Sequence, residues 1–180
     1  QPGSNLRREI ESFIRPPLFP VDLSILPCQI EFIEMSSGQL RCGSSKVTIA
    51  PVPHCGPTNG YRIDNAGASV VYIPDHQQPL DGSFTIADSV AELCADADIL
   101  IHDAQYDDAE FATKADWGHS TVSCAAEVAR RCGLKRLLLF HHDPSHDDDA
   151  LDRMFAEARN GVALPFALTA GTEGAVFDLP

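Results

Sequence analysis

The sequence predicts an α/β protein with a layered sheet and helices on one outer face of that sheet. Two observations predict this class. Short runs rich in Ile, Val, Phe and Tyr follow one another between residues 29 and 73 and are separated by turn sequences, which is typical of an antiparallel meander. After Asp81-Gly82 the patterns of helix and strand alternate, as they do in layered α/β sheets.

The first half of the chain is predicted to begin with a helix and to continue as strands. Apolar residues recur at helical spacing over residues 6–14, and Arg15-Pro16-Pro17 ends this pattern. An irregular Pro-rich stretch follows. The predicted strands are 29–34, 39–43, 46–51, 60–64 and 69–73.

The second half is predicted to alternate between helices and strands. Ser120 or Thr121 is expected to cap a helix over 121–132, and Gly133 stands where a helix usually stops. The helix predicted over 147–160 begins with three aspartates. They favour a helix start there, because acidic side chains stabilise the positive end of a helix dipole. The remaining predictions are a helix over 86–95 and strands over 98–103, 136–141, 166–170 and 174–178.

Length and composition favour one domain, 1–180, because 180 residues with 44% hydrophobic content suffice for one substantial core. There is no apolar run of 18 residues and no signal-peptide pattern at the start. The six cysteines lack the spacing of a disulfide framework, which favours free thiols in a reducing cytoplasm. Cys55 is of interest because it follows His54 directly, and thiolate is a good zinc ligand.

The charge of the chain bears on its partners. A formal net charge of -13 repels phosphate backbones, and the sequence has no basic stripe that would bind a long nucleic acid. We therefore expect a small-molecule substrate, no long nucleic acid and no membrane.

Four histidines and aspartates each stand where a strand-like run gives way to a loop: His54, Asp75, His119 and His141. Strands that end together on one side of a sheet bring such side chains into one cleft. Imidazole and carboxylate groups there can hold a divalent metal and activate water. The leading interpretation is a metal-dependent hydrolase.

Each candidate also has an ordinary structural interpretation. A lone histidine such as His54 is more often a hydrogen-bonded loop residue than a ligand. The ordinary interpretation of Asp75 is the start of a turn, although a carboxylate that ends an apolar strand is costly to desolvate without a cation. His76 is expected to face solvent or to support a ligand. Gly118-His119-Ser120-Thr121 is either a simple helix cap or a site where glycine allows close approach and His119 donates a proton.

Five motifs carry a more specific resemblance: Gly60-Tyr-Arg-Ile, Tyr72-Ile-Pro-Asp-His, Ile99-Leu-Ile-His-Asp-Ala-Gln-Tyr, Gly118-His-Ser-Thr and Leu139-Phe-His-His-Asp-Pro. Their order resembles the second half of metallo-β-lactamase-fold hydrolases and is most similar to the ribonuclease Z-like and cyclic-phosphodiesterase branch. The resemblance covers about Pro17 to Pro180. It implies an αββα sandwich of which this chain supplies mainly the C-terminal half.

The resemblance also implies the metal ligands. His54 matches a ligand of the first metal, Asp75 the carboxylate that bridges both metals, and His141 a ligand of the second, with His142 as the alternative to His141. The expected cofactors are two divalent ions, with zinc preferred and manganese or iron as alternatives. In that family a hydroxide held between the metals attacks phosphorus.

The same resemblance implies which residue assists the leaving group and which residue orients it. His119 matches the histidine that assists the leaving group, and Asp103 is placed to orient that histidine and keep it protonated. The substrate is then expected to be a small phosphodiester. Further residues expected to line the pocket or support the ligands are Tyr106, His146, Asp147, His76 and His142.

One departure from the family pattern matters. The His-x-His-x-Asp-His motif, which supplies ligands to both metals, does not occur in the 180 residues. We therefore expect a C-terminal portion that associates with an N-terminal half or with another copy of the chain. The open alternatives are a lactone or thioester hydrolase of the same fold, and a non-catalytic interaction module without a complete metal site. A His-x-His-x-Asp-His motif in the encoded sequence upstream of Gln1 would settle both the fold and whether this chain is a C-terminal portion.

Overall fold

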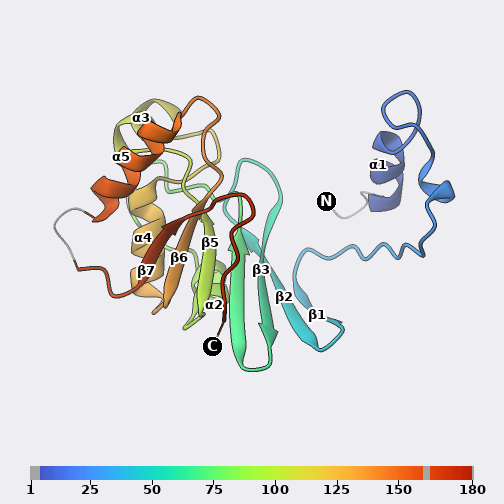
Figure 1. Cartoon of the computed structure of the whole chain (residues 1–180), viewed down its shortest axis with the longest axis horizontal. Helices are drawn as coiled ribbons and strands as arrows, with labels where there is room; N and C mark the ends of the chain where they lie inside the picture. The colour runs from blue at the N-terminus through green and yellow to red at the C-terminus, as the bar shows by residue number, and fades with distance from the viewer. Residues whose placement is uncertain (1–4, 160–162, 180) are drawn as a thin grey trace. The chain divides into compact units, whose positions relative to one another are not determined.

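The computed structural model describes residues 5–159 and 163–179, and the chain divides into two compact units, 1–36 and 37–180 (Figure 1). The single domain expected from the sequence stays a prediction. The predicted end of the last helix, Asn160-Gly161, lies outside the described residues.

The first unit contains the predicted N-terminal helix, α1 (Leu6–Phe13), and a short 3-10 helix, η1 (Leu23–Ile25). Residues 29–34 form no strand, so that prediction is wrong. A strand needs a neighbouring strand to pair its backbone groups, and within this unit the segment instead contacts α1. The Phe32 ring lies 4.8 Å from the Arg7 guanidinium, and the Leu6 backbone N–H donates to Glu34 at 2.6 Å.

The second unit is built on a seven-stranded sheet in the order β1 to β7. Its first three pairings are antiparallel and its last three are parallel. The strands are β1 (Gly38–Cys42), β2 (Ser45–Val52), β3 (Thr58–Asn65), β4 (Ala68–Ile73), β5 (Ile99–Asp103), β6 (Arg136–Phe140) and β7 (Ala167–Ala170). The corresponding sequence predictions are confirmed.

The strand predicted over 174–178 is wrong. Its backbone begins in a turn, in which the Ala175 N–H donates to the Thr172 carbonyl at 3.1 Å. The Phe177 ring then lies 5.4 Å from the Arg136 guanidinium. In Figure 1 this C-terminal segment runs in front of the sheet and does not extend it.

The direction of the strands decides where the candidate residues lie. β4, β5 and β6 are mutually parallel, and β2 points the same way because two antiparallel pairings separate it from β4. The carboxyl ends of these strands therefore share one edge of the sheet. His54 and Asp75 follow β2 and β4, Asp103 ends β5, and His141 follows β6.

The helices of this unit are α2 (Asp88–Cys94), α3 (Asp108–Lys114), α4 (Val122–Arg131) and α5 (Asp148–Arg159). In Figure 1, α2 and α4 lie behind the sheet, as predicted. Thr121 caps α4, because its Oγ1 accepts a hydrogen bond from the Cys124 N–H at 3.0 Å. α3 was not predicted.

The core fills the space between the sheet and these helices. Alternate side chains of β4 point to the helices, because successive residues of a strand face opposite sides, and both Val71 and Ile73 are fully buried. Other fully or nearly fully buried members of the cluster are Leu100, Leu137, Leu139, Val90, Leu93, Ala125 and Val128. This packed layer holds the carboxyl ends of the strands in place.

Among the described residues, no helix has both the length and the apolar character that crossing a membrane requires.

Candidate metal centre

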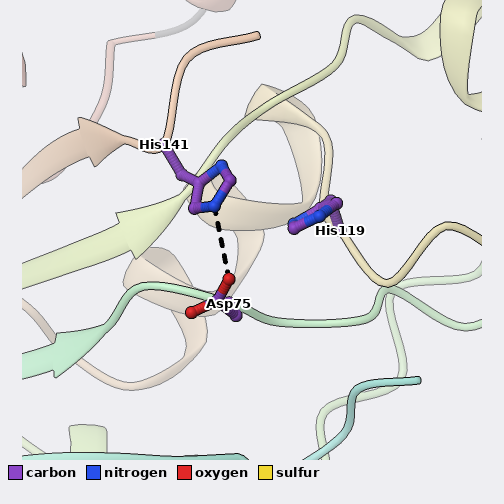
Figure 2. Close-up of side chains that lie close together, drawn as sticks. All are labelled: Asp75, His119 and His141. Carbon is purple, nitrogen blue, oxygen red and sulfur yellow. Dashed lines mark ion pairs between the residues drawn. The ribbon is translucent and has the colours of Figure 1, made fainter. Parts of the chain in front are cut away.

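Three side chains meet at the carboxyl edge of the sheet: Asp75, His119 and His141 (Figure 2). Each offers a ligand atom, and these atoms all lie within 4.8 Å of one another. The Nε2 atom of His141 is 3.2 Å from an oxygen of Asp75, and the rings of His119 and His141 have their centroids 4.6 Å apart. One carboxylate and two imidazoles at this spacing suit a divalent metal.

The backbone at His141 supports a special role for this residue. His141 has a φ of 59°, in the left-handed region that non-glycine residues rarely adopt. Such conformations cluster at functional sites, where the surrounding structure holds them. Its Nδ1 atom is buried and has no hydrogen-bond partner among the described residues, and its Nε2 atom is the one that faces Asp75.

His119 is paired with the buried carboxylate of Asp103. Its Nδ1 lies 2.8 Å from Asp103 Oδ2, and Asp103 is completely buried. This hydrogen bond raises the pKa of His119 above its ordinary value, while partial burial opposes the rise. Because Nδ1 faces Asp103, Nε2 is the atom left for the cluster of Asp75 and His141.

Gly118 joins the loop after β2 to the segment that holds His119. Its carbonyl oxygen is 2.7 Å from Nδ1 of His54. A carbonyl can only accept, so Nδ1 of His54 carries the proton and, in the neutral ring, Nε2 keeps its lone pair for a metal. Cys55, whose thiol lies 3.4 Å from that Nε2, is exposed and free.

Replacing Gly118 by alanine is expected to destabilise the protein by about 1–2 kcal/mol or more and to displace the His54 ring. Gly118 has a φ of 101°, and an added Cβ would lie 2.6 Å from Cε1 of His54, so backbone strain and a clash combine. Urea unfolding measures the first effect. The matched control is Gly67→Ala, at a φ of 89° with open space around it, which should show the strain alone and leave the His54 NMR signals unchanged.

His76 is 3% exposed, so the solvent-facing alternative is wrong. Its backbone N–H donates to Asp103 Oδ2 at 3.0 Å, and its carbonyl accepts from the Ser120 hydroxyl at 2.6 Å. His76 therefore connects the Asp75 segment to both Asp103 and the start of α4. This position agrees with the alternative in which His76 supports a ligand.

Tyr106, which was predicted to line the pocket, also lies beside His119. Its ring is buried and its centroid is 6.1 Å from that of His119. Burial raises the pKa of Tyr106 to about 12, which keeps the phenol neutral. The ammonium of Lys114 lies 4.6 Å from the Tyr106 ring.

Three other predicted residues have structural contacts away from the cluster. The His142 ring packs against Phe155 of α5, with centroids 5.6 Å apart. The Nε2 atom of His146 is 2.8 Å from Glu110 of α3. Asp147 is exposed and caps α5 by accepting from the Ala150 N–H at 2.8 Å. The structure thus brings His141, and not His142, beside Asp75.

Two residues near the site were missed in the sequence. Lys114 forms an ion pair with Asp143 at 3.3 Å and so ties α3 to the loop after β6. His102 is fully buried inside β5. A histidine in the middle of an apolar strand is itself a signal, because a buried imidazole needs hydrogen-bond partners.

The fold and the site define a protein of the metallo-β-lactamase class: a mixed sheet whose strand ends gather histidines and aspartates at one edge. The family model described as "Beta-lactamase superfamily domain" matches residues 5–142. The chain belongs to this family.

The relatives include ribonuclease Z proteins, which confirms the predicted resemblance to that branch. The chain is 40% identical over 79 residues to ribonuclease Z of Geobacillus kaustophilus, a match that covers 44% of this chain and 26% of that protein. It is 41% identical over 73 residues to human zinc phosphodiesterase ELAC protein 1, covering 41% of this chain and 20% of the relative. The matched segments thus span about a quarter of the relatives' length.

Solved structures confirm the predicted fold class. The metallo-beta-lactamase fold protein YhfI from Bacillus subtilis aligns with a TM-score of 0.63 and 21% identity, over 78% of this chain and 52% of that one. The short form of human tRNase Z, ELAC1, aligns with a TM-score of 0.58 and 24% identity, over 78% and 46%. The chain therefore spans about half of each.

Proposed function

We propose that this chain is part of a metal-dependent hydrolase of the phosphodiesterase type, with His119 as the proton donor to the leaving oxygen. The observation that carries the proposal is the 2.8 Å hydrogen bond between His119 and the buried carboxylate of Asp103, next to Asp75 and His141. An oxygen that leaves phosphorus with a developing negative charge needs a proton. A histidine kept protonated at that place can supply it.

The donor set fits divalent metal ions. We assign His54 to a first ion, the Asp75 carboxylate to a bridging position and His141 to a second ion. Zinc is preferred, because imidazole and carboxylate are common zinc ligands and a relative is named a zinc phosphodiesterase; manganese and iron accept the same ligands. When bound, such ions lower the pKa of water and neutralise charge that develops at phosphorus.

His119 is close enough to Asp75 and His141 to act as a third ligand, so its role needs an argument. The hydrogen bond to Asp103 raises the pKa of His119 and so favours the protonated imidazole. A protonated imidazole donates from both nitrogens and cannot bind a metal. Its Nδ1–H is held by Asp103, and its Nε2–H is free to donate to the substrate. This is the reason for assigning His119 to proton transfer.

The substrate we propose is a small phosphodiester. The names of the relatives, ribonuclease Z and tRNase Z, point to RNA as the substrate of those proteins. This chain, however, contains 26 acidic residues and only 13 lysines and arginines. A protein that binds a long nucleic acid normally needs a cationic side chain for each phosphate that it contacts. Ligands beyond His54, Asp75 and His141 would come from an associated N-terminal half or from a second copy.

The proposal predicts which bond is broken. The full-length protein loaded with zinc should hydrolyse a chromogenic phosphodiester such as bis(p-nitrophenyl) phosphate much faster than a lactone or a thioester, because the site is assigned to neutralising the charge that develops at phosphorus. Preference for the lactone would instead assign the site to carboxylic ester chemistry. Metal analysis of the same sample separates both from an inert interaction module, which stoichiometric zinc contradicts.

A further inference from the structure

Two buried histidines near the candidate metal centre, His76 and His102, are hydrogen-bonded to each other. The Nδ1 atom of His76 is 2.9 Å from Nε2 of His102, and the His102 Nδ1 atom is 2.6 Å from the backbone carbonyl of Asp103. The side chain of His102 is fully buried, and His76 is 3% exposed. Polar groups this deep are costly unless they are paired, so the arrangement calls for an explanation.

The proton positions in this pair follow from its partners. A carbonyl oxygen can only accept, so Nδ1 of His102 carries a proton. Burial disfavours a charged ring, and the pKa of His102 is lowered for that reason. Neutral His102 therefore has a bare Nε2, which accepts from the Nδ1–H of His76. Each ring is held in one tautomer and one orientation.

The fixed ring of His76 affects both Asp75 and the Asp103–His119 pair. It is the neighbour of Asp75 in the chain, and its backbone N–H donates to Asp103 Oδ2 at 3.0 Å. The same Asp103 oxygen accepts from His119 at 2.8 Å. Fixing the ring of His76 thus fixes the backbone that carries Asp75 and one of the hydrogen bonds that orient the Asp103 carboxylate.

We propose that His102 is a positioning residue that acts through the ring of His76 to hold the Asp103–His119 pair and Asp75 in one geometry. The proposal rests on the proposed function for its catalytic consequence, but its structural part stands on the hydrogen bonds alone. Without His102, the Nδ1–H of His76 loses its acceptor inside the protein. Because an unpaired buried donor is unfavourable, the His76 segment would shift to find another partner.

The structural part is tested by NMR of the ¹⁵N-histidine-labelled chain without metal. Two-bond ¹H–¹⁵N spectra should show Nδ1–H tautomers for both His76 and His102. An Nε2–H tautomer at His102 would overturn the proposal.

Three variants of His102 separate its two hydrogen bonds. His102→Gln can still present an acceptor near the position of Nε2, His102→Asn reaches only the position of Nδ1, and His102→Phe removes both groups at similar size. We expect the His119 Nδ1–H signal to be retained in the glutamine variant and to shift or broaden in the other two. A folded phenylalanine variant with an unchanged His119 signal would contradict the proposal.

A matched control is available at the other end of the same strands. The buried Asp98 side chain links β5 to β4 by accepting from the Ser69 N–H at 2.7 Å. Asp98→Asn should lower the denaturant midpoint and leave the His119 signal unchanged. A purely structural role for His102 predicts that the two positions behave alike.

Kinetics test the catalytic consequence. In the zinc-loaded full-length protein, His102→Phe should lower kcat about 10–100-fold for a phosphodiester with an alkyl leaving group, and less for p-nitrophenolate, which needs little protonation. Equal losses for both substrates would contradict positioning through His119. If the wild-type protein hydrolyses neither substrate, the proposed function fails, whereas the NMR results still decide the role of His102.

Discussion

His119→Ala is expected to lower turnover of an alkyl phosphodiester by about 10²–10⁴-fold, the usual contribution of a positioned general acid, while zinc content stays unchanged. The reason is that His119 is assigned to the leaving oxygen and not to the metal. Its Nδ1 is occupied by Asp103 at 2.8 Å. Steady-state kinetics together with metal analysis of the same preparation measure both quantities.

The choice of leaving group makes this experiment specific. With p-nitrophenolate, which is stable without a proton, the loss should be much smaller than with an alkoxide. Tyr106→Phe is the control, because it keeps the ring packed against His119 and removes only a neutral hydroxyl. Loss of zinc in His119→Ala, with equal losses for both substrates, would reassign His119 as a ligand.

The pH dependence has a definite sign. The pKa of His119 is raised, chiefly by its hydrogen bond to Asp103, and the proton donor exists only below that pKa. Activity on the alkyl substrate should therefore fall as pH rises through the raised pKa. Asp103→Asn removes the cause of the rise, so the fall should move to lower pH. The comparison of the two proteins holds whether or not bound metal lowers both values.

The sequence was most informative where chemistry and strand pattern coincide. His54, Asp75 and His141 each follow an apolar run, and parallel strands necessarily present such residues at one edge. The sequence also predicted that another group lies close to the Gly118 backbone, because a glycine directly before His119 leaves room for a neighbour that a side chain would exclude. The structure adds the partner, which is the His54 ring.

Other features depend on tertiary contacts that the sequence pattern does not contain. Residues 29–34 have the composition of a strand, but they contact α1 and pair with no strand in the described part of the chain. Helix α3 is short and begins with a reciprocal cap between Asp107 and Glu110, with hydrogen bonds of 2.7 and 3.1 Å. The signal Asp-x-x-Glu was present, although the following apolar pattern is weak.

The roles of neighbouring histidines could not be separated by sequence. His141 and His142 are adjacent, and both follow β6. The left-handed backbone at His141 turns that residue to Asp75, whereas the His142 ring packs against Phe155. Likewise, the aspartates from Asp147 onward suggested both a helix start and a pocket. Only the hydrogen bond to the Ala150 N–H identifies Asp147 as a cap.

This pair of histidines gives the second prediction, which can be tested on the chain itself. His141→Ala is expected to weaken zinc binding more than about 100-fold, beyond the 10–100-fold typical of changes that only support a ligand. The physical reason is the loss of one of the three residues assigned as ligands, whose Nε2 atom lies 3.2 Å from an oxygen of Asp75. Isothermal titration calorimetry with zinc measures the affinity directly.

His142→Ala is the matched control, one residue away and equally a histidine. It removes a packing contact with Phe155 and should reduce stability without changing zinc affinity. Thermal unfolding gives an independent reading, because zinc at 100 times its dissociation constant stabilises the folded state by about 2.7 kcal/mol. That stabilisation should persist in His142→Ala and fall to about 0.4 kcal/mol or less in His141→Ala at the same zinc concentration. The reverse pattern would make His142 the ligand and require the loop after β6 to rearrange when metal binds, since the His142 ring now faces α5 and not Asp75.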